Sequence, residues 1–333
     1  MYHPSFRIRR LVRITLLALA VPALAYALRT TEPGPGIKDP DRTPGITSAR
    51  GIWIDMYRGG AVSEKEMVKD LGNADVIYIG ETHTISRHHS LEQMLVSSMC
   101  ENGKRIVVAM EQLEKKHQPF IERFNRGNIS FNELAEKISW EKTWSNYRDY
   151  RGVLETARAC GARIIGMNAS AEVVKKVARK GIPGLGPVER ALLPADIDTG
   201  QGHYRELLGR LLMVHSHMGQ ERIDRYYEAQ VSRDETMASV IAGVISDGPG
   251  VRVVAIGGSM HFSWGLGVPA RVSRRVPGVK DRIVILSESG ELELSPVQKA
   301  MAGRVIITHQ DLKKIPYPLA DYLHIMCGNT QTK

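Results

Sequence analysis

Val76-Ile-Tyr-Ile-Gly-Glu-Thr-His83 decides the fold, because an apolar run there ends abruptly in a glycine, a carboxylate and an imidazole. The β-branched and aromatic residues at 75–79 predict a short buried strand. Gly80 allows a tight turn out of the strand and the close approach of a ligand. Glu81 and His83, two residues apart on the loop, can both point inward. The alternative is that this pair only caps the helix that follows.

Short apolar runs recur from residue 50 onward, and amphipathic stretches separate them. Strands that alternate with helices in this way predict an α/β fold with a mostly parallel central sheet flanked by helices. Leu91, Met94, Leu95 and Met99 recur at helical spacing and are expected in the core. His88 shares this packing face, whereas His89 is expected to face solvent. The predicted strands are 52–56, 75–79, 106–110, 163–167, 251–256 and 282–286.

Polar residues follow four of these predicted strands. In open α/β sheets, ligands bind beyond the carboxyl ends of the strands, where the loops converge. Glu81 and His83 follow one strand, and Glu111 with Gln112, Asn168 and His261 follow the others. Two carboxylates and two imidazoles are therefore expected in one pocket, although each residue alone could simply stabilise its loop.

Residues 170–246 lack a convincing strand and contain two helical patterns, 204–218 and 220–245. They predict a smaller all-helical subdomain, inserted into an α/β domain made of residues 50–169 and 247–325, with a tail at 326–333. Of residues 296–333, only 305–308 and 319–325 are expected to pack. The glycine-rich turn at 181–187 follows a helix and lacks the third glycine of a dinucleotide loop, which excludes that ligand class.

One face of the second helical pattern carries Gln230, Arg233, Asp234 and Met237 at positions i, i+3, i+4 and i+7. This spacing lets a helix direct a polar triad at a pocket, and arginine is well suited to bind a carboxylate or a propionate. The alternative is an exposed face of ion pairs.

The N-terminus is typical of an export signal: four arginines in the first 13 residues precede an apolar run at 14–28. We expect a signal peptide at 1–27 with cleavage after Ala27, and a flexible linker rich in proline and glycine at 28–49. An uncleaved anchor is the alternative. The expected location is periplasmic or membrane-associated, and no cysteine follows the apolar run as in a lipoprotein. Cys100, Cys160 and Cys327 are scattered and odd in number, so they are expected to be packing residues without a disulfide framework.

The composition sets the remaining limits. Hydrophobic residues make up 43% and charged residues 24% of the 333 residues, which are ordinary globular values. Lys and Arg number 45 against 36 Asp and Glu, but the excess is slight once the N-terminal arginines are set aside. No basic stripe interleaved with aromatic residues is present, so nucleic acid is not expected as a partner.

Five segments, taken in order, resemble the ChaN-like haem-binding uptake proteins of the superfamily that includes the Tiki/TraB proteases and the erythromycin esterases. The resemblance implies haem held between protomers of a homodimer, an oxygen-type tyrosine ligand, and a role in iron acquisition with a haem-uptake transport machinery. Glu81, His83, Glu111 and His261 match its pocket positions, and Arg233 and Asp234 match its helical motif. The segments are 76–83, 109–112, 164–168, 229–238 and 257–269.

Two functions follow from these residues. The first is haem binding, with Tyr227 and Tyr204 as the favoured iron ligands among the tyrosines and histidines of the helical region, and with Glu81, His83, Gln230, Arg233, Asp234 and His261 nearby. The second is hydrolysis, in which Glu81, His83, Glu111 and His261 bind a divalent metal ion or activate water. Ser259 as a nucleophile is a weaker version of the second, and a scaffold with a vestigial pocket is the least favoured reading.

Overall fold

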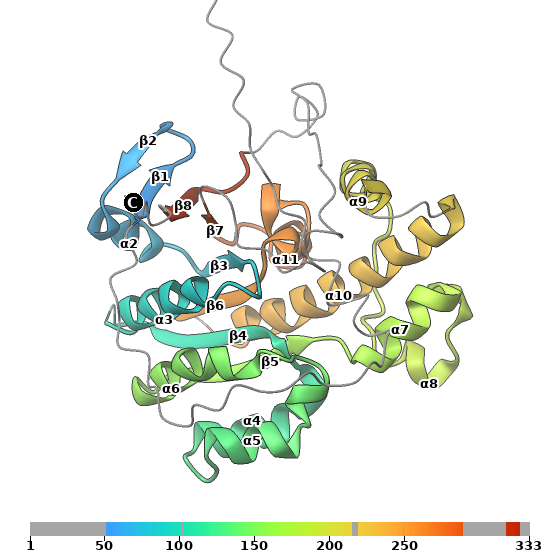
Figure 1. Cartoon of the computed structure of the whole chain (residues 1–333), viewed down its shortest axis with the longest axis horizontal. Coiled ribbons are helices and arrows are strands. Elements are labelled where there is room, and N and C mark those ends of the chain that lie inside the picture. Colours follow the sequence, from blue (N-terminus) through green and yellow to red (C-terminus); the bar gives the residue numbers. More distant parts are fainter. Residues whose placement is uncertain (1–50, 102, 215–218, 249, 289–317, 327–333) are drawn as a thin grey trace, which may run out of the picture.

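The computed structural model describes residues 51–101, 103–214, 219–248, 250–288 and 318–326. The expected signal peptide and linker, the packing segment 305–308, all but the first residue of the tail, and Cys327 lie outside these residues. Figure 1 shows the arrangement of the described part.

A single eight-stranded sheet forms the centre, in the order β2-β1-β8-β7-β3-β6-β4-β5. The six strands from β8 to β5 pair in parallel, and β1 pairs antiparallel with both β2 and β8. The predicted mostly parallel sheet is confirmed. All six predicted strands are present, and the expected packing of 319–325 takes the form of β8. The strands are β1 (Gly51–Asp55), β2 (Gly60–Val62), β3 (Val76–Glu81), β4 (Arg105–Glu114), β5 (Arg163–Asn168), β6 (Val251–Gly258), β7 (Asp281–Glu288) and β8 (Tyr322–Met326).

Helices cover both faces of the sheet (Figure 1). One face packs against α2 to α6 and the other against α10 and α11. The helices are α2 (Glu64–Leu71), α3 (Ser86–Cys100), α4 (Gln118–Asn125), α5 (Phe131–Lys137), α6 (Arg151–Ala159), α7 (Ala171–Lys180), α8 (Pro187–Arg190), α9 (Gly202–Val214), α10 (Gln220–Ser246) and α11 (Val268–Arg275). Short 3₁₀ turns join them, among them η3 (Tyr147–Tyr150), η5 (Ser259–His261) and η6 (Ser263–Gly265).

The alternation of side chains between the two faces explains why the central strands are largely apolar on both faces. In β3, Val76 and Tyr78 pack on the α10 face, whereas Ile77 and Ile79 pack on the α3 face. A parallel sheet that is covered on both faces must bury both sets of side chains, so the strand reads as a continuous apolar run. The pleat therefore determines which helical layer each strand residue meets.

Residues 170–246 contain no strand within their described part, as predicted. The second helical pattern corresponds to α10, and the first to α9, which is described to Val214. Met237 and Ile241 of α10 lie in the core against the sheet, while the other end of this helix packs with α7 and α9. No described helix has both the length and the apolar character needed to cross a membrane.

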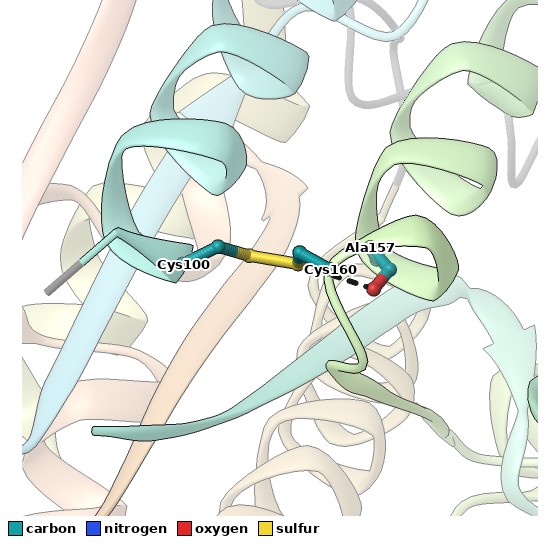
Figure 2. The surroundings of a disulfide bond; sticks show 3 residues. All are labelled: Cys100, Ala157 and Cys160. Carbon is teal, nitrogen blue, oxygen red and sulfur yellow. Dashed lines mark hydrogen bonds between the residues drawn. A yellow bond between two sulfur atoms is a disulfide. The ribbon is translucent and has the colours of Figure 1, made fainter. Parts of the chain in front are cut away.

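A disulfide bond joins Cys100 to Cys160, so the expectation of unpaired packing cysteines is wrong for these two (Figure 2). Cys100 ends α3, and Cys160 directly follows α6. The two helices lie side by side, which brings the Cα atoms to 6.1 Å across 60 residues of sequence. Scattered spacing hides such a pair, because only the packing of the two helices brings the thiols together.

Candidate functional site

Four strand ends meet at one edge of the sheet, because β3, β6, β4 and β5 are consecutive neighbours. Glu81 is paired in register with Gly258, and Met110 with Ile256. Glu81 is therefore the last residue of β3 that pairs with β6, and Glu111 directly follows the last residue of β4 that pairs with β6. His261 lies just after β6, in η5. These residues thus lie at a common edge of the sheet, where the sequence predicted that the strand ends converge.

The pleat separates the polar residues at this edge into two sets. Glu81 continues the series of Ile77 and Ile79 and faces α3, whereas Glu111 continues the series of Val107 and Ala109 and faces α10. We define the α3-side set as Glu81, His89, Glu92, Gln112 and Tyr150. We define the α10-side set as Glu111, Arg233, Asp234 and His261.

Glu81 is the centre of the α3-side set and is 1% exposed. Its Oε1 atom accepts hydrogen bonds from His83 Nδ1 at 2.8 Å, Gln112 Nε2 at 2.5 Å and the Tyr150 hydroxyl at 2.8 Å. Burial alone would raise the pKa of Glu81, but the neighbouring His83 and His89 hold it well below its usual range. The carboxylate therefore stays ionised in the interior.

His89 is buried in this set, so the expectation that it faces solvent is wrong. The first turn of α3 lies over the end of β3, which brings His89 Nδ1 to 3.1 Å from Glu81 Oε2 and 3.2 Å from Glu92 Oε2. Burial opposes a charge on the ring, but the two carboxylates raise the pKa of His89 to about 11. Burial and the Glu81 carboxylate raise the pKa of Glu92. His88 is also buried, as expected, and its Nδ1 accepts the Thr82 N–H at 2.9 Å.

Glu111 is the centre of the α10-side set. One of its oxygens accepts the backbone N–H of Gly258 at 2.6 Å, and the other pairs with the Arg233 guanidinium and lies 3.3 Å from His261 Nε2. Burial would raise the pKa of Glu111, but His261 and Arg233 hold it well below its usual range. Gly257 makes room for this carboxylate, because a Cβ atom there would lie 2.6 Å from Glu111 Oε2.

His261 joins the strand end to α10. Its Nδ1 lies 2.5 Å from Asp234 Oδ1, and Gln230 Nε2 lies 2.9 Å from the same nitrogen. Burial opposes protonation, yet Glu111 and Asp234 raise the pKa of His261 to about 9. Tyr204 completes the chain of contacts by donating its hydroxyl to Asp234 Oδ2 at 2.6 Å. The polar face predicted for this helix thus points at the strand ends, and Met237 packs on the sheet below it.

His83 bridges the two sets and lies at their more exposed edge. Its Nδ1 contacts Glu81, and its Nε2 lies 3.8 Å from Glu111 Oε1. Trp144 packs edge-on against the ring with 4.7 Å between centroids, and Asn146 donates to the His83 carbonyl oxygen. The His83 side chain is 13% exposed, against 4% or less for Glu81, Glu111 and His261. A substrate would therefore meet His83 before the buried carboxylates.

The two favoured tyrosines lie together beside the α10-side set, with 6.2 Å between ring centroids. Both residues are 1% exposed and pack with Leu207, Leu208 and Trp264. Burial and the Asp234 carboxylate raise the pKa of Tyr204 well above its usual value. The Tyr227 hydroxyl lies 3.1 Å from the main-chain oxygen of Thr199 and 3.5 Å from that of Gln201, and Arg205 lies over its ring.

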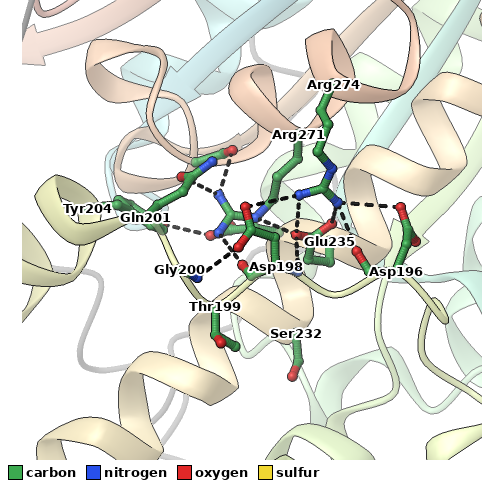
Figure 3. Close-up of polar contacts among 12 residues, drawn as sticks. Asp196, Asp198, Thr199, Gly200, Gln201, Tyr204, Ser232, Glu235, Arg271 and Arg274 are labelled. Atoms are coloured by element: carbon green, nitrogen blue, oxygen red, sulfur yellow. Dashed lines mark hydrogen bonds and ion pairs between the residues drawn. The ribbon is translucent and has the colours of Figure 1, made fainter.

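A further buried cluster, which was not predicted from the sequence, holds the segment before α9 in place (Figure 3). Glu235 pairs with Arg271 at 3.1 Å and Arg274 at 2.8 Å, and its Oε1 also accepts the backbone N–H of Asp198 at 2.9 Å. Arg271 in turn donates to Gln201 at 3.1 Å. These contacts fix the segment 196–201 against α10 and α11, and so position Tyr204.

Several residues of the site gave little signal in the sequence. Tyr150 and Trp144 lie in the irregular stretch before α6, which no strand or helix periodicity marks. Glu92 resembles any polar residue of an amphipathic helix until α3 is placed over β3. Gln112 was predicted to follow a strand, but its contact with Glu81 depends on the pleat of β4.

The donor chemistry separates the two functions expected from the sequence. The strand-end sets are rich in carboxylates that already pair with His and Arg, and they suit proton transfer better than the binding of anionic propionates. The region around Tyr227 suits haem better, since it combines a phenol, apolar side chains and the cationic Arg205. In the described part of the chain, no hydrogen bond joins the Ser259 hydroxyl to a histidine.

Comparison with known proteins gives one family match and several similar structures. The family model for haem-binding uptake, Tiki superfamily, ChaN matches residues 67–272. The structure of ChaN of Campylobacter jejuni with cofacial haem is 21% identical, has a TM-score of 0.62 and covers 84% of this chain and 97% of its own. At this identity the likeness shows the fold.

Two further proteins are more distant. A mutant of the erythromycin esterase EreC in its open conformation is 12% identical with a TM-score of 0.46, over 82% of this chain and 97% of its own. RETICULATA-RELATED 5, a chloroplastic protein of Arabidopsis thaliana, is 24% identical over an alignment of 240 residues that covers 67% of this chain and 32% of that protein. The chain thus spans about a third of the length of this curated relative.

Proposed function

The chain belongs to the ChaN family of haem-binding uptake proteins in the Tiki superfamily, and from this premise we propose that it is an exported protein that binds haem for uptake or handling. The observation that carries the proposal is the family match over residues 67–272, which include both polar sets, the tyrosine pair and the helix that joins them. The proposed partners are haem, a second copy of the chain and a haem-uptake transport machinery.

The proposed haem site is the α9–α10 side of the molecule. Tyr227 is the better iron ligand of the two tyrosines, because its hydroxyl donates to neutral carbonyl oxygens of the described residues. Tyr204 donates to a carboxylate, which opposes loss of its proton. Both rings are 1% exposed, so ligation by Tyr227 requires α9 to move away from α10. The bound haem would supply the iron centre and its absorption spectrum.

Export is supported by the arginine-rich apolar N-terminus and by the disulfide between Cys100 and Cys160. Disulfides persist in oxidising compartments and are rare in reducing ones. A fusion of residues 1–45 to a reporter that is active only outside the cytoplasm tests this part. The control is the same reporter fused to a known signal peptide. If the control is active and the fusion of residues 1–45 is inactive, export is contradicted.

A haemin titration of the full chain tests haem binding, with the Soret band and the oligomeric mass read on the same samples. We expect saturation at one haem per chain together with dimer formation. A featureless titration that does not saturate would remove the haem proposal. Saturation of a chain that stays monomeric would support haem binding and contradict a haem site shared between protomers.

A hydrolase is the second candidate, and the geometry of His83 and His261 favours it. Because Glu81 holds His83 Nδ1, the Nε2 atom of the neutral ring can accept a proton from water. The water oxygen would then attack an ester carbonyl carbon. As the carbon–oxygen bond breaks, the leaving oxygen would take a proton from His261, whose raised pKa keeps it protonated at neutral pH.

Ester hydrolysis by the wild type and by His83→Gln tests this second candidate. We expect His83→Gln to lower kcat by about 100-fold or more, because it removes the proton acceptor. His117→Gln is the matched control, since His117 lies in η1 (Lys115–His117) outside both sets. Equal rates in the two variants would contradict the mechanism.

A further inference from the structure

Glu81, His89 and Glu92 bring three potential ligand atoms within 4.8 Å of one another inside the protein. Glu81 ends β3, and the other two lie three residues apart on the same face of α3. None of the three is more than 4% exposed. This triad differs from Glu81, His83, Glu111 and His261, which were the ligands expected from the sequence.

The orientation of His89 is that of a metal ligand. Its Nε2 lies 3.2 Å from the carbonyl oxygen of His83, while its Nδ1 faces the two carboxylates. A histidine that binds a metal through one nitrogen characteristically donates its other N–H to a carbonyl or carboxylate, which fixes the tautomer and the ring. His89 already has this arrangement.

Among the residues that the structure describes, two carboxylate oxygens of the triad have no hydrogen-bond partner: Glu81 Oε2 and Glu92 Oε1. Glu81 Oε2 lies 3.1 Å from His89 Nδ1, but that nitrogen is aligned with Glu92 Oε2 and has only one proton to give. Three donors hold the other oxygen of Glu81, which directs Oε2 toward the triad. A buried carboxylate oxygen without a partner is costly. A bound cation would satisfy both of these oxygens.

We propose that Glu81, His89 and Glu92 bind one divalent first-row transition metal ion. The metal ion would displace the proton on His89 Nδ1, because a histidine ligand binds in its neutral form. Two carboxylates and the neutral imidazole then carry a charge that a divalent ion balances, and a mixed nitrogen and oxygen donor set suits Zn²⁺ and Mn²⁺. The site lies on the α3 side of the sheet, away from Tyr227 and the proposed haem. The two proposals rest on different residues, so either can fail alone.

Zinc binding to the full chain, stripped of metal with a chelator and free of haem, tests the site. We expect the wild type to bind one Zn²⁺ per chain and Glu92→Gln to bind at least ~100-fold more weakly. Glu114→Gln is the matched control, because Glu114 is a buried glutamate of β4 outside the triad, and it should bind like the wild type. Absence of saturable binding, or equal binding by Glu92→Gln, would overturn the proposal.

X-ray absorption at the zinc edge tests the wild type directly, in case Glu92→Gln does not fold. The triad supplies a single imidazole, so the spectrum should fit one histidine nitrogen with oxygen ligands. The set of Glu81, His83, Glu111 and His261 supplies two imidazoles. A spectrum that requires two would place the ion there and overturn the triad.

Discussion

His261 Nδ1 lies 2.5 Å from Asp234 Oδ1, and this contact ties the loop after the central strand β6 to the long helix α10. Tyr204 holds the other oxygen of Asp234 at 2.6 Å, and Glu111 lies 3.3 Å from the other nitrogen of His261. The tyrosine pair and the strand ends are therefore joined by one chain of polar contacts. A change at either end should be measurable at the other.

The raised pKa of His261 makes part of the stability depend on pH. The value rises from 6.5 in the unfolded chain to about 9 in the folded protein, so the ring contributes fully below pH ~6.5, and this contribution is lost as the pH rises through about 9. The difference corresponds to about 3 kcal/mol. Urea unfolding at pH 6 and pH 9.5 should show a larger loss for the wild type than for His261→Gln. Equal losses would show that His261 is not the group responsible.

The two tyrosines should respond differently to removal of their hydroxyls. Tyr227→Phe should shift the Soret band of the haemin complex without unfolding the protein, because it removes the proposed iron ligand. Tyr204→Phe should keep the spectrum but lower the free energy of unfolding by ~1–3 kcal/mol, since the buried Asp234 oxygen loses its donor. An unchanged spectrum in both variants would remove tyrosine ligation by this pair.

Removal of the disulfide should destabilise the protein strongly. A bond that closes a loop of 60 residues reduces the entropy of the unfolded chain by an amount worth roughly 4 kcal/mol. The variant with Cys100→Ala and Cys160→Ala should unfold at a correspondingly lower urea concentration. Cys327→Ala, which removes the remaining cysteine, should unfold like the wild type in oxidising buffer. If reductant leaves the wild-type midpoint unchanged, the bond does not form in solution.

Gly257→Ala tests how tightly Glu111 is packed. The new Cβ would lie 2.6 Å from Glu111 Oε2 and 3.2 Å from the Phe262 ring, so we expect a loss of ~1–3 kcal/mol in unfolding free energy. Gly243→Ala is the control, because this exposed glycine of α10 has open space around it. It should stabilise the helix by up to ~1 kcal/mol. Equal effects of the two substitutions would contradict the close packing of Glu111 against Gly257.

The order and type of the main elements could be predicted because the strands are buried on both faces. Each central strand contains a short apolar run that is rich in β-branched residues, and the residues between strands follow helical spacing. The face of Gln230, Arg233 and Asp234 was also predictable, since helical spacing alone puts these residues together. The predicted strand ends and this helix face together contain all four residues of the α10-side set.

The α3-side set was less accessible, because it depends on how α3 lies over β3. His89 was expected in solvent, since its sequence neighbours do not reveal that its ring turns toward Glu81. The disulfide was missed for the same reason, as Cys100 and Cys160 meet only when α3 and α6 pack together. The Glu235 cluster joins segments far apart in sequence, and no local pattern links an acid on α10 to the arginines of α11.

The strand register limits the insertions and deletions that the protein can tolerate within its strands. Because successive residues of β3 and β4 face opposite layers, a one-residue deletion inside Val76–Glu81 would turn Glu81 away from His89 and toward the layer that holds Arg233. The same deletion in β4 would send Glu111 to the opposite side. Homologous chains that keep both polar sets should therefore vary in length between their strands and helices, while the distance from each strand's first apolar residue to its terminal carboxylate stays constant.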